Sequence, residues 1–305
     1  MTDTAPIRIG TRGSPLALVQ ARMVESALHQ QGHDCEIVAI KTTGDQIQDR
    51  TLMEAGGKGL FTKELDEAQL DRRVDIAVHS MKDVPTWLPH GLTLNAMLPR
   101  ADPRDAWLSR DGKSLDDLPA GAVVGTASLR RGAQIKHRRP DVTVIPIRGN
   151  VDTRLGKLRD GEVDATLLAC AGLDRLGRAE TVPHERIEPE VLLPAVAQGA
   201  VGITCREGDS VTIDKLAPLH CPVTGLRVAA ERAMLEVLDG SCHTPIAALA
   251  VLDGEELRLS GLVIRPDGSE QIAGYEAGAA AEAQAIGAEL GRRIKKDMPA
   301  GFMVE

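Results

Sequence analysis

The sequence predicts an α/β protein built from two similar, hinged α/β domains and a small C-terminal α+β domain. Short apolar strands alternate with amphipathic helices as far as about residue 217, a pattern typical of sheets covered by helices on both faces. Of 305 residues, 43% are hydrophobic but only 2% are aromatic, so we expect aliphatic cores. After Cys221 a helix, two or three strands and an Ala-rich helix from about Ala279 follow, which predicts the third domain.

The chain is expected to open with a strand, a turn and a helix. Ile7 to Gly10 forms the strand, and Ser14 caps a helix that begins at Pro15 and runs to about Gln31, since serine before proline is a common helix start. The helix is indicated by apolar residues that recur at three- and four-residue spacing, namely Leu16, Val19, Met23 and Ala27. Arg12 stands just before this helix N-terminus, where unpaired N–H groups favour an anion.

A long polar stretch follows the next strand, Glu36 to Ile40. It runs from Thr42 to Gly59, and loops of this length inside a compact domain are usually functional or disordered. We interpret it as a mobile lid that turns Lys58 toward the site, with a solvated loop as the alternative. A helix from about Thr62 to Asp71 leads back to the sheet.

The strand Ile76 to Val78 runs directly into the polar residues Lys82 and Asp83. In parallel sheets covered on both faces, ligands bind beyond the carboxyl ends of the strands. We therefore expect Asp83 to be the residue at which chemistry occurs. The alternative is a surface salt bridge between neighbours before Pro85.

A domain crossing is expected at residues 99–104, which combine two prolines with alternating charge. Ala122 to Gly125 and Val142 to Ile147 are then predicted strands. Ser128 caps the helix between them, which repeats the layout around Ser14. The segment at 163–168 repeats the pattern at 74–78, so two similar halves are plausible, although this match is weak evidence by itself.

The last third is expected to return to the first domain and then form the third. Leu193 to Cys205 is apolar and β-like, which predicts a hinge strand with Gln198 at its turn. An amphipathic helix is predicted from Leu226 to Leu238. The expected domains are residues 1–100 with 195–217, residues 103–193, and residues 220–305.

Arginines cluster at the predicted strand ends, among glycines and hydroxyl residues. They are Arg12, Arg130, Arg131, Arg148 and Arg154. Since cations at a helix N-terminus are disfavoured by the dipole, and guanidinium binds carboxylates and phosphates bidentately, we expect a ligand with several such groups. A nucleic-acid patch at Arg130 to Arg139 is disfavoured, because no aromatic residue interleaves it and the net charge is −8.

Five cysteines, an odd number scattered at 35, 170, 205, 221 and 242, argue against a disulfide framework. With no leader pattern and no apolar run of membrane-spanning length, the sequence predicts a cytoplasmic protein. Cys242 lies in a predicted loop after a helix, where an exposed thiol could act as a nucleophile. A zinc site made by residues 220–221 and 242–243 is the less favoured alternative, because adjacent Cys and His pairs do not match the usual ligand spacing.

These stretches together resemble the porphobilinogen deaminase (hydroxymethylbilane synthase) family from Ile7 to about Pro266. The matching motifs are TRGSPLAL at 11–18, GGKGLF at 56–61, HSMKDVP at 79–85, DPRDA at 102–106, GTASLRR at 125–131, RGN at 148–150 and QGAVG at 198–202. Seven motifs in the same order are highly specific. The resemblance implies two hinged α/β domains like those of type II periplasmic binding proteins, and a monomer.

The resemblance also implies the activity and its residues. The family joins four porphobilinogens head to tail into hydroxymethylbilane and releases ammonia, using a dipyrromethane cofactor held by a thioether to the cysteine that matches Cys242. Asp83 would be the catalytic carboxylate. Acetate and propionate groups would be held by the five arginines, assisted by Ser14, Lys82, Ser128 and Gln198. We assign Lys82, Ser128, Arg130, Arg131 and Gln198 to the cofactor, and Arg12, Ser14, Arg148 and Arg154, together with Lys58 of the lid, to the substrate.

Four positions depart from the common family pattern: Glu54, Ala127, Ser241 and His243. His243 could lower the pKa of the Cys242 thiol and alter cofactor loading. Another class of function also stays open: hinged α/β halves around an anion suit a two-domain solute-binding module for a polycarboxylate. That module would release no ammonia from porphobilinogen. No metal, nucleic acid or membrane partner is expected.

Overall fold

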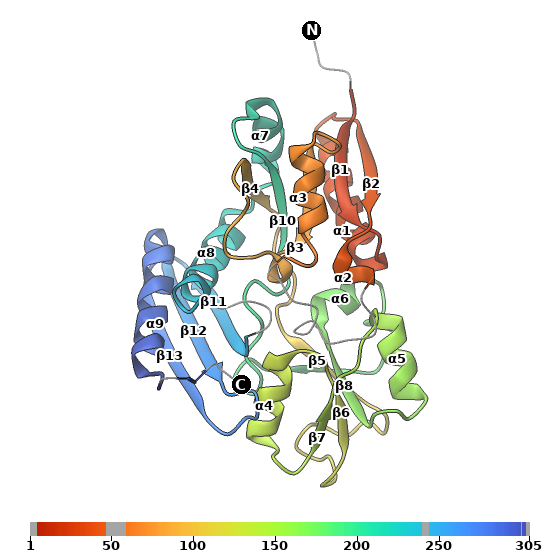
Figure 1. The fold of residues 1–305 in the computed structure, drawn as a ribbon, viewed down its shortest axis with the longest axis vertical. Helices are drawn as coiled ribbons and strands as arrows, with labels where there is room; N and C mark the ends of the chain where they lie inside the picture. The colour runs from red at the N-terminus through yellow and green to blue at the C-terminus, as the bar shows by residue number, and fades with distance from the viewer. Residues whose placement is uncertain (1–4, 47–58, 240–243, 300, 303–305) are drawn as a thin grey trace. The chain divides into compact units, whose positions relative to one another are not determined.

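The computed structural model describes residues 5–46, 59–239, 244–299 and 301–302 (Figure 1). The chain divides into two compact units, Met1–Ala101 with Ala200–Gly225 and Asp102–Gly199 with Leu226–Glu305. The described residues form three sheets, of five, five and three strands. Among these residues, no helix combines the length and the apolar character needed to cross a membrane. Each unit is described by itself below.

The first unit contains a mixed sheet in the order β2-β1-β3-β10-β4. Its strands are β1 (Ile7–Arg12), β2 (Cys35–Ile40), β3 (Ile76–Ser80), β4 (Leu92–Met97) and β10 (Val201–Arg206). β1 is parallel to β2 and β3, whereas β10 is antiparallel to both of its neighbours. The helical segments are α1 (Pro15–Gln30), α2 (Thr43–Gln46), α3 (Lys63–Leu70), η1 (Met81–Asp83), α7 (Ser210–Leu216) and η2 (Ala217–Leu219). The carboxyl ends of β1 and β3 therefore lie next to each other.

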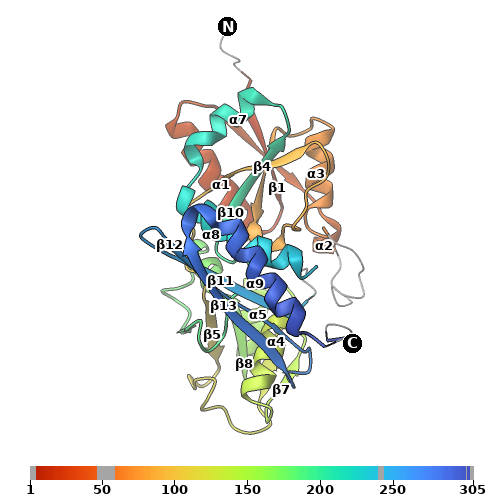
Figure 2. The ribbon, with the colours of Figure 1, turned by 90° about the vertical axis from the view of Figure 1, so that its left-hand side faces the viewer.

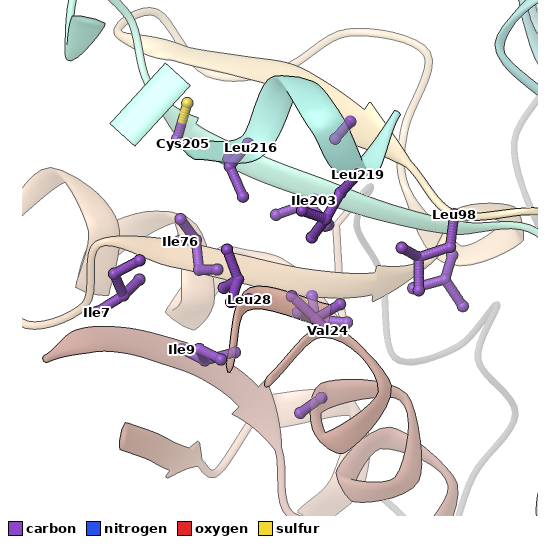
Figure 3. Packing of buried hydrophobic residues seen from close by; sticks show 14 residues of the cluster. Ile7, Ile9, Val24, Leu28, Ile76, Leu98, Ile203, Cys205, Leu216 and Leu219 are labelled. Carbon is purple, nitrogen blue, oxygen red and sulfur yellow. The ribbon is translucent and has the colours of Figure 1, made fainter. Parts of the chain in front are cut away.

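The core of this unit is aliphatic, as expected. Figure 3 shows Val24 and Leu28 of α1 packed with Ile9, Ile76 and Ile203 of the sheet in one cluster of buried side chains. Each such side chain contributes about 1.5–3 kcal/mol when fully buried. In α1 the buried positions are Ala17, Gln20, Ala21, Val24 and Leu28, whereas Met23 is exposed.

The second unit repeats the same strand order. Its five-stranded sheet runs β7-β6-β8-β5-β9, with β5 (Asp105–Ser109), β6 (Val123–Gly125), β7 (Thr143–Ile145), β8 (Ala165–Ala169) and β9 (Glu185–Ile187). β6 is parallel to β7 and β8, and β5 is antiparallel to β8 and β9. β6 and β8 thus occupy the places of β1 and β3, and β5 that of β10, which confirms two similar α/β halves. The helices here are α4 (Leu129–Arg138), α5 (Val151–Arg159) and α6 (Cys170–Arg175).

The three-stranded sheet also belongs to the second unit and confirms the predicted α+β element. Its antiparallel strands are β11 (Ile246–Asp253), β12 (Glu256–Ile264) and β13 (Gln271–Ala279). Helices α8 (Pro222–Val237) and α9 (Ala283–Asp297), the latter preceded by η3 (Ala280–Glu282), lie over one face (Figures 1 and 2). On the other face, Leu249, Leu262 and Ile264 pack with Ala133 of α4 and with Leu193.

Two local expectations differ from the structure. Leu193 to Ala200 is not a strand, because β10 begins only at Val201; the apolar side chains of Leu193, Val196 and Ala197 are buried by packing. The polar stretch from Thr42 begins with the short helix α2, whose Thr43 backbone N–H donates to the Glu64 carboxylate. The rest of the predicted lid, residues 47–58, lies outside the described residues.

One acidic side chain in the first unit is buried, and no cation among the described residues is given as its partner. Asp66 of α3 is 7% exposed, and its Oδ1 has no hydrogen-bond partner. Burial raises the pKa of Asp66 to about 6, although the Thr62 side chain opposes this by hydrogen bonding. The folded protein therefore holds this proton where the unfolded chain, with a pKa near 3.9, has lost it. Stability linked to Asp66 is full below about pH 4 and is lost as the pH rises through 6.

We expect Asp66→Asn to stabilise the protein at pH 8. The amide stays neutral, so the variant avoids the cost of the buried carboxylate, roughly 3 kcal/mol for a pKa elevation from 3.9 to about 6. Denaturant unfolding at pH 8 and pH 4 measures this, and the advantage should disappear at pH 4. Asp71→Asn, at the exposed end of the same helix, is the matched control with no pH-dependent gain. Equal stability of wild type and Asp66→Asn at pH 8 would refute the assignment.

Candidate active site

In the first unit, Arg12 and Asp83 meet at the carboxyl ends of adjacent strands. Arg12 is the last residue of β1, and Asp83 ends η1 directly after β3. Arg12 Nη1 lies 3.7 Å from Asp83 Oδ2, and the two side chains are 22% and 27% exposed. The Arg12 guanidinium also lies 4.2 Å from the centre of the Phe61 ring, a cation–π distance. Asp83 is thus an accessible carboxylate beside a fixed cation.

The turn after β1 forms as the sequence predicts. Ser14 caps α1 by accepting a hydrogen bond from the Ala17 backbone N–H, with Pro15 at the first helical position. The Thr11 hydroxyl donates to the Ala17 carbonyl, which ties the strand end to the helix. Ser14 is therefore a helix cap next to Arg12. Lys82 is half-buried within η1, between Met81 and Asp83.

A buried polar network supports the strand that carries Asp83. His79 Nε2 lies 3.0 Å from Thr204 Oγ1, and the Thr204 hydroxyl donates to the Gln69 side chain. Burial, with a smaller contribution from the positive charge of Arg12, lowers the pKa of His79 to about 4. His79 is therefore neutral at physiological pH and serves as support for β3 rather than as a titrating group.

In the second unit, Arg130 and Arg131 converge on one buried carboxylate. Ser128 caps α4 by accepting from the Arg131 N–H. Asp105 is fully buried, with Oδ1 2.7 Å from Arg131 Nη2 and Oδ2 2.8 Å from Arg130 Nη1. Burial alone would raise the pKa of Asp105, but the two guanidinium groups outweigh it and hold that pKa well below its usual range. Arg130 Nε is buried and has no hydrogen-bond partner.

Arg154 lies close enough to Arg131 and Arg148 for their positive charges to repel its own. Asn150 caps α5 by accepting from the Thr153 N–H, and Arg154 Nε donates to the Gly149 carbonyl at 3.1 Å. Burial, followed by the positive charges of Arg131 and Arg148, lowers the pKa of Arg154 to about 10. The concentration of desolvated positive charge favours a bound polyanion.

Gln198 takes a supporting position rather than an open one. Its side chain is buried, and Nε2 donates to Asp105 Oδ1 at 2.8 Å and to the Pro103 carbonyl at 2.7 Å. The contact of Gln198 with the cofactor stays a prediction. In this structure its side-chain amide hydrogen-bonds to Asp105 and orients it. Asp105 in turn orients the two arginines.

Two residues were missed from the sequence. Asp105 stood inside the DPRDA motif without a role, because its arginine partners lie 25 and 26 positions away. Arg175 ends α6; its Nη2 donates to the Gly199 carbonyl at 2.7 Å, and its Nε is buried without a partner. Burial lowers the pKa of Arg175. A basic residue in the last turn of a helix is so common that its position carried no signal.

Some predicted site residues lie outside the described residues: Lys58, Cys242 and the departures Glu54, Ser241 and His243. No cluster of three or more His, Cys, Asp or Glu side chains suited to a metal occurs in the part of the chain that the structure describes. His220 Nδ1 accepts from the Met97 backbone N–H, and the Cys221 N–H donates to the Met97 carbonyl. These contacts connect residues 220 and 221 to the end of β4.

Comparison with known proteins decides the family. Residues 7–214 match the family model "Porphobilinogen deaminase, dipyromethane cofactor binding domain", and residues 225–296 match "Porphobilinogen deaminase, C-terminal domain". The chain belongs to the porphobilinogen deaminase family. A porphobilinogen deaminase of Paracoccus denitrificans (strain Pd 1222) is 52% identical over 301 residues, covering 97% of this chain and 96% of that protein. The family resemblance of the sequence motifs is thus confirmed.

Solved structures outside the porphobilinogen deaminase family are also similar. A probable amino-acid ABC transporter extracellular-binding protein, ytmK of Bacillus subtilis, has a TM-score of 0.44 at 13% identity and covers 71% of this chain and 90% of its own. An ancestral arginine-binding protein has a TM-score of 0.39 at 16% identity, with coverage of 70% and 90%. With TM-scores below 0.5, these similarities carry no conclusion about this chain.

The residues present fit the cofactor that the family model names. A dipyrromethane carries acetate and propionate groups, and the second unit offers buried guanidinium N–H groups without partners on Arg130 and Arg175. Arg154 adds a cation whose pKa burial and its neighbours have lowered. Carboxylates would pair with these donors and relieve the repulsion among the cations.

Proposed function

We propose that this chain joins four porphobilinogen molecules head to tail into hydroxymethylbilane, with release of ammonia at each condensation, in tetrapyrrole biosynthesis. The two family models and the 52% identical porphobilinogen deaminase support this activity. The structural observation that supports it most is the cluster of Arg130, Arg131 and Arg154. Asp105 pairs with the first two arginines, and Arg148 adds a further positive charge near Arg154. A growing chain that gains two carboxylates per substrate matches such a cluster.

In the proposed mechanism, the Asp83 carboxylate accepts hydrogen bonds from the pyrrole N–H groups. It also stabilises the positive charge that develops when ammonia leaves the substrate. Its exposed fraction and its place beyond β3 support this role. Arg12, held by the Phe61 ring, keeps the carboxylate in a fixed position. Cys242 would hold the dipyrromethane, which when bound would supply a pyrrole carbon for the first condensation. A thioether to a soft thiolate suits this attachment.

Two sets of residues are proposed to bind carboxylates. Arg130 and Arg131, with Lys82, Ser128 and Gln198, are proposed to hold the acetate and propionate groups of the cofactor. The proposed substrate set is Arg12, Ser14, Lys58, Arg148 and Arg154. We add Arg175 to the substrate set, because its Nε is buried and has no hydrogen-bond partner. Ser14 and Ser128 contribute chiefly by fixing the helix starts beside the arginines.

We also propose that the protein is a cytoplasmic monomer without a nucleic-acid or membrane partner. The four described cysteines, Cys35, Cys170, Cys205 and Cys221, form no disulfide with one another, which agrees with a reducing compartment. The division into three domains at the residues given above belongs to the same proposal.

Ammonia release tests the activity directly. Purified protein is incubated with porphobilinogen, and ammonia and hydroxymethylbilane are measured together. We expect about four ammonia molecules for each bilane, as the proposed stoichiometry requires. Binding of porphobilinogen without release of ammonia would instead show a solute-binding module and overturn the proposal.

A further inference from the structure

The segment Leu193–Gly199, here called the joining segment, is held at many points within the second unit. Leu193 N–H donates to the Gln134 side chain, and Leu193 O accepts from Arg130 Nη1 at 2.8 Å. Pro194 O accepts from the Ala248 N–H of β11. At the other end, Gly199 O accepts from Arg175. The segment therefore contacts several of the groups proposed to bind carboxylates.

A buried glutamate holds the middle of the joining segment. Glu231 of α8 has no exposed surface. Its Oε2 accepts from the Ala197 N–H at 2.6 Å, and its Oε1 accepts from the Ala250 N–H of β11 at 2.8 Å. One carboxylate thus links a helix, a sheet edge and the joining segment. None of the assigned cofactor or substrate roles uses it.

The residue that Glu231 holds has an unfavourable backbone conformation. Ala197 has φ 58°, in the left-handed region. Residues with a Cβ disfavour this region, whereas glycine adopts it readily. This conformation directs the next residue, Gln198, so that its Nε2 reaches Asp105 Oδ1 at 2.8 Å. Asp105 then fixes Arg130 and Arg131. The chain of contacts runs from Glu231 through Ala197 and Gln198 to the arginine pair.

We propose that Glu231 is a positioning residue: its carboxylate holds Ala197 in the left-handed conformation that lets Gln198 and Asp105 orient Arg130 and Arg131. The inference rests on the proposed function in one respect, that these arginines bind the carboxylates of the cofactor and its growing chain. Glu231 itself is not proposed to contact the cofactor or the growing chain. Arg131 lies close enough to the substrate-set residue Arg154 for its charge to act on it, so displacing Arg131 also disturbs the substrate site. We therefore expect loss of Glu231 to weaken carboxylate binding, that of porphobilinogen included, with little change in the chemical step.

The test compares four forms of the holoenzyme: wild type, Glu231→Gln, Ala197→Gly and the double variant. Glutamine keeps the shape but turns an NH₂ group toward one of the two backbone donors, so one N–H loses its acceptor. Backbone hydrogen exchange across residues 195–199 and the KM and kcat for porphobilinogen are measured. Glu236→Gln, the same change at an exposed position of α8, is the matched control.

In Glu231→Gln we expect faster exchange at the Ala197 amide and a KM raised roughly tenfold, in line with loss of a buried hydrogen bond. The kcat should change by less than about threefold. In the double variant KM should return to within about twofold of wild type, since glycine adopts the left-handed conformation unaided. Exchange at position 197 should stay fast there. A purely structural role would not give this rescue of KM.

Wild-type exchange at 197 in Glu231→Gln, an unchanged KM, or failure of Ala197→Gly to restore KM would each overturn the proposal. If Glu231→Gln does not fold, Glu231→Asp replaces it: the charge stays, but the side chain is one methylene shorter and cannot span both donors. If the wild type releases no ammonia, the proposed function fails. The exchange data still decide whether Glu231 holds the joining segment.

Discussion

Asp83→Asn is expected to lower bilane formation by about 10²–10⁴-fold, the usual contribution of a positioned acid–base group. The amide can neither accept a proton nor balance the positive charge that develops on the substrate. The fold should be unaffected, because the Asp83 side chain is 27% exposed and its ion pair with Arg12 spans 3.7 Å. Steady-state turnover of the holoprotein measures the effect, with thermal unfolding as the check on folding.

Asp214→Asn is the matched control for this prediction. Asp214 is an exposed aspartate on α7 of the same unit, so the same chemical change there should leave turnover within about twofold, since it touches no reacting group. Full turnover in Asp83→Asn would remove Asp83 from the mechanism. A variant that loses activity together with its folded state would assign the residue a structural role instead.

Asp105→Asn is expected to have the largest effect on stability. Removing the charge leaves Arg130 and Arg131 buried without their carboxylate, and breaking a buried ion pair costs about 3–5 kcal/mol of unfolding free energy. Because the folded-state pKa of Asp105 is held well below its usual range, its stabilisation is present above the unfolded pKa near 3.9. The difference between wild type and variant should shrink as the pH falls below that value.

Denaturant unfolding at pH 7 provides the measurement for Asp105→Asn. Asp116→Asn is its control, because Asp116 also pairs with an arginine, Arg138, but is 58% exposed; exposed pairs contribute about 0–1 kcal/mol. A loss of stability in Asp105→Asn no greater than in the control would show that the two buried arginines do not depend on this carboxylate.

Features set by neighbouring residues could be predicted from the sequence. The caps at Ser14 and Ser128 depend on residues within three positions, and serine at a helix start is a local preference. The repeat of strand, turn and helix around these serines correctly indicated two similar halves. The arginines beside them predicted a site for a ligand with several carboxylates, which stays a prediction; the structure places Arg131 and Arg148 near enough to Arg154 to contribute to its lowered pKa.

Features set by distant contacts could not be predicted. Leu193 to Ala200 was interpreted as a strand because its residues are apolar, yet Leu193 packs with α4 and the three-stranded sheet, and Val196 and Ala197 are buried outside any strand. The left-handed Ala197 is a conformation that local preference would have assigned to glycine. Glu231 maintains it from 34 residues away. Asp105 and Gln198 likewise acquire their roles only through partners that the fold brings close.

The mass of the intact purified protein, followed by peptide mapping around Cys242, tests the central claim most directly. The account predicts an excess equal to one dipyrromethane, located on the peptide that contains Cys242. If the preparation is unmodified, porphobilinogen is added and the mass is measured again, with the same excess expected. A mass that remains unmodified after this addition, or a modification on another cysteine, would contradict the account.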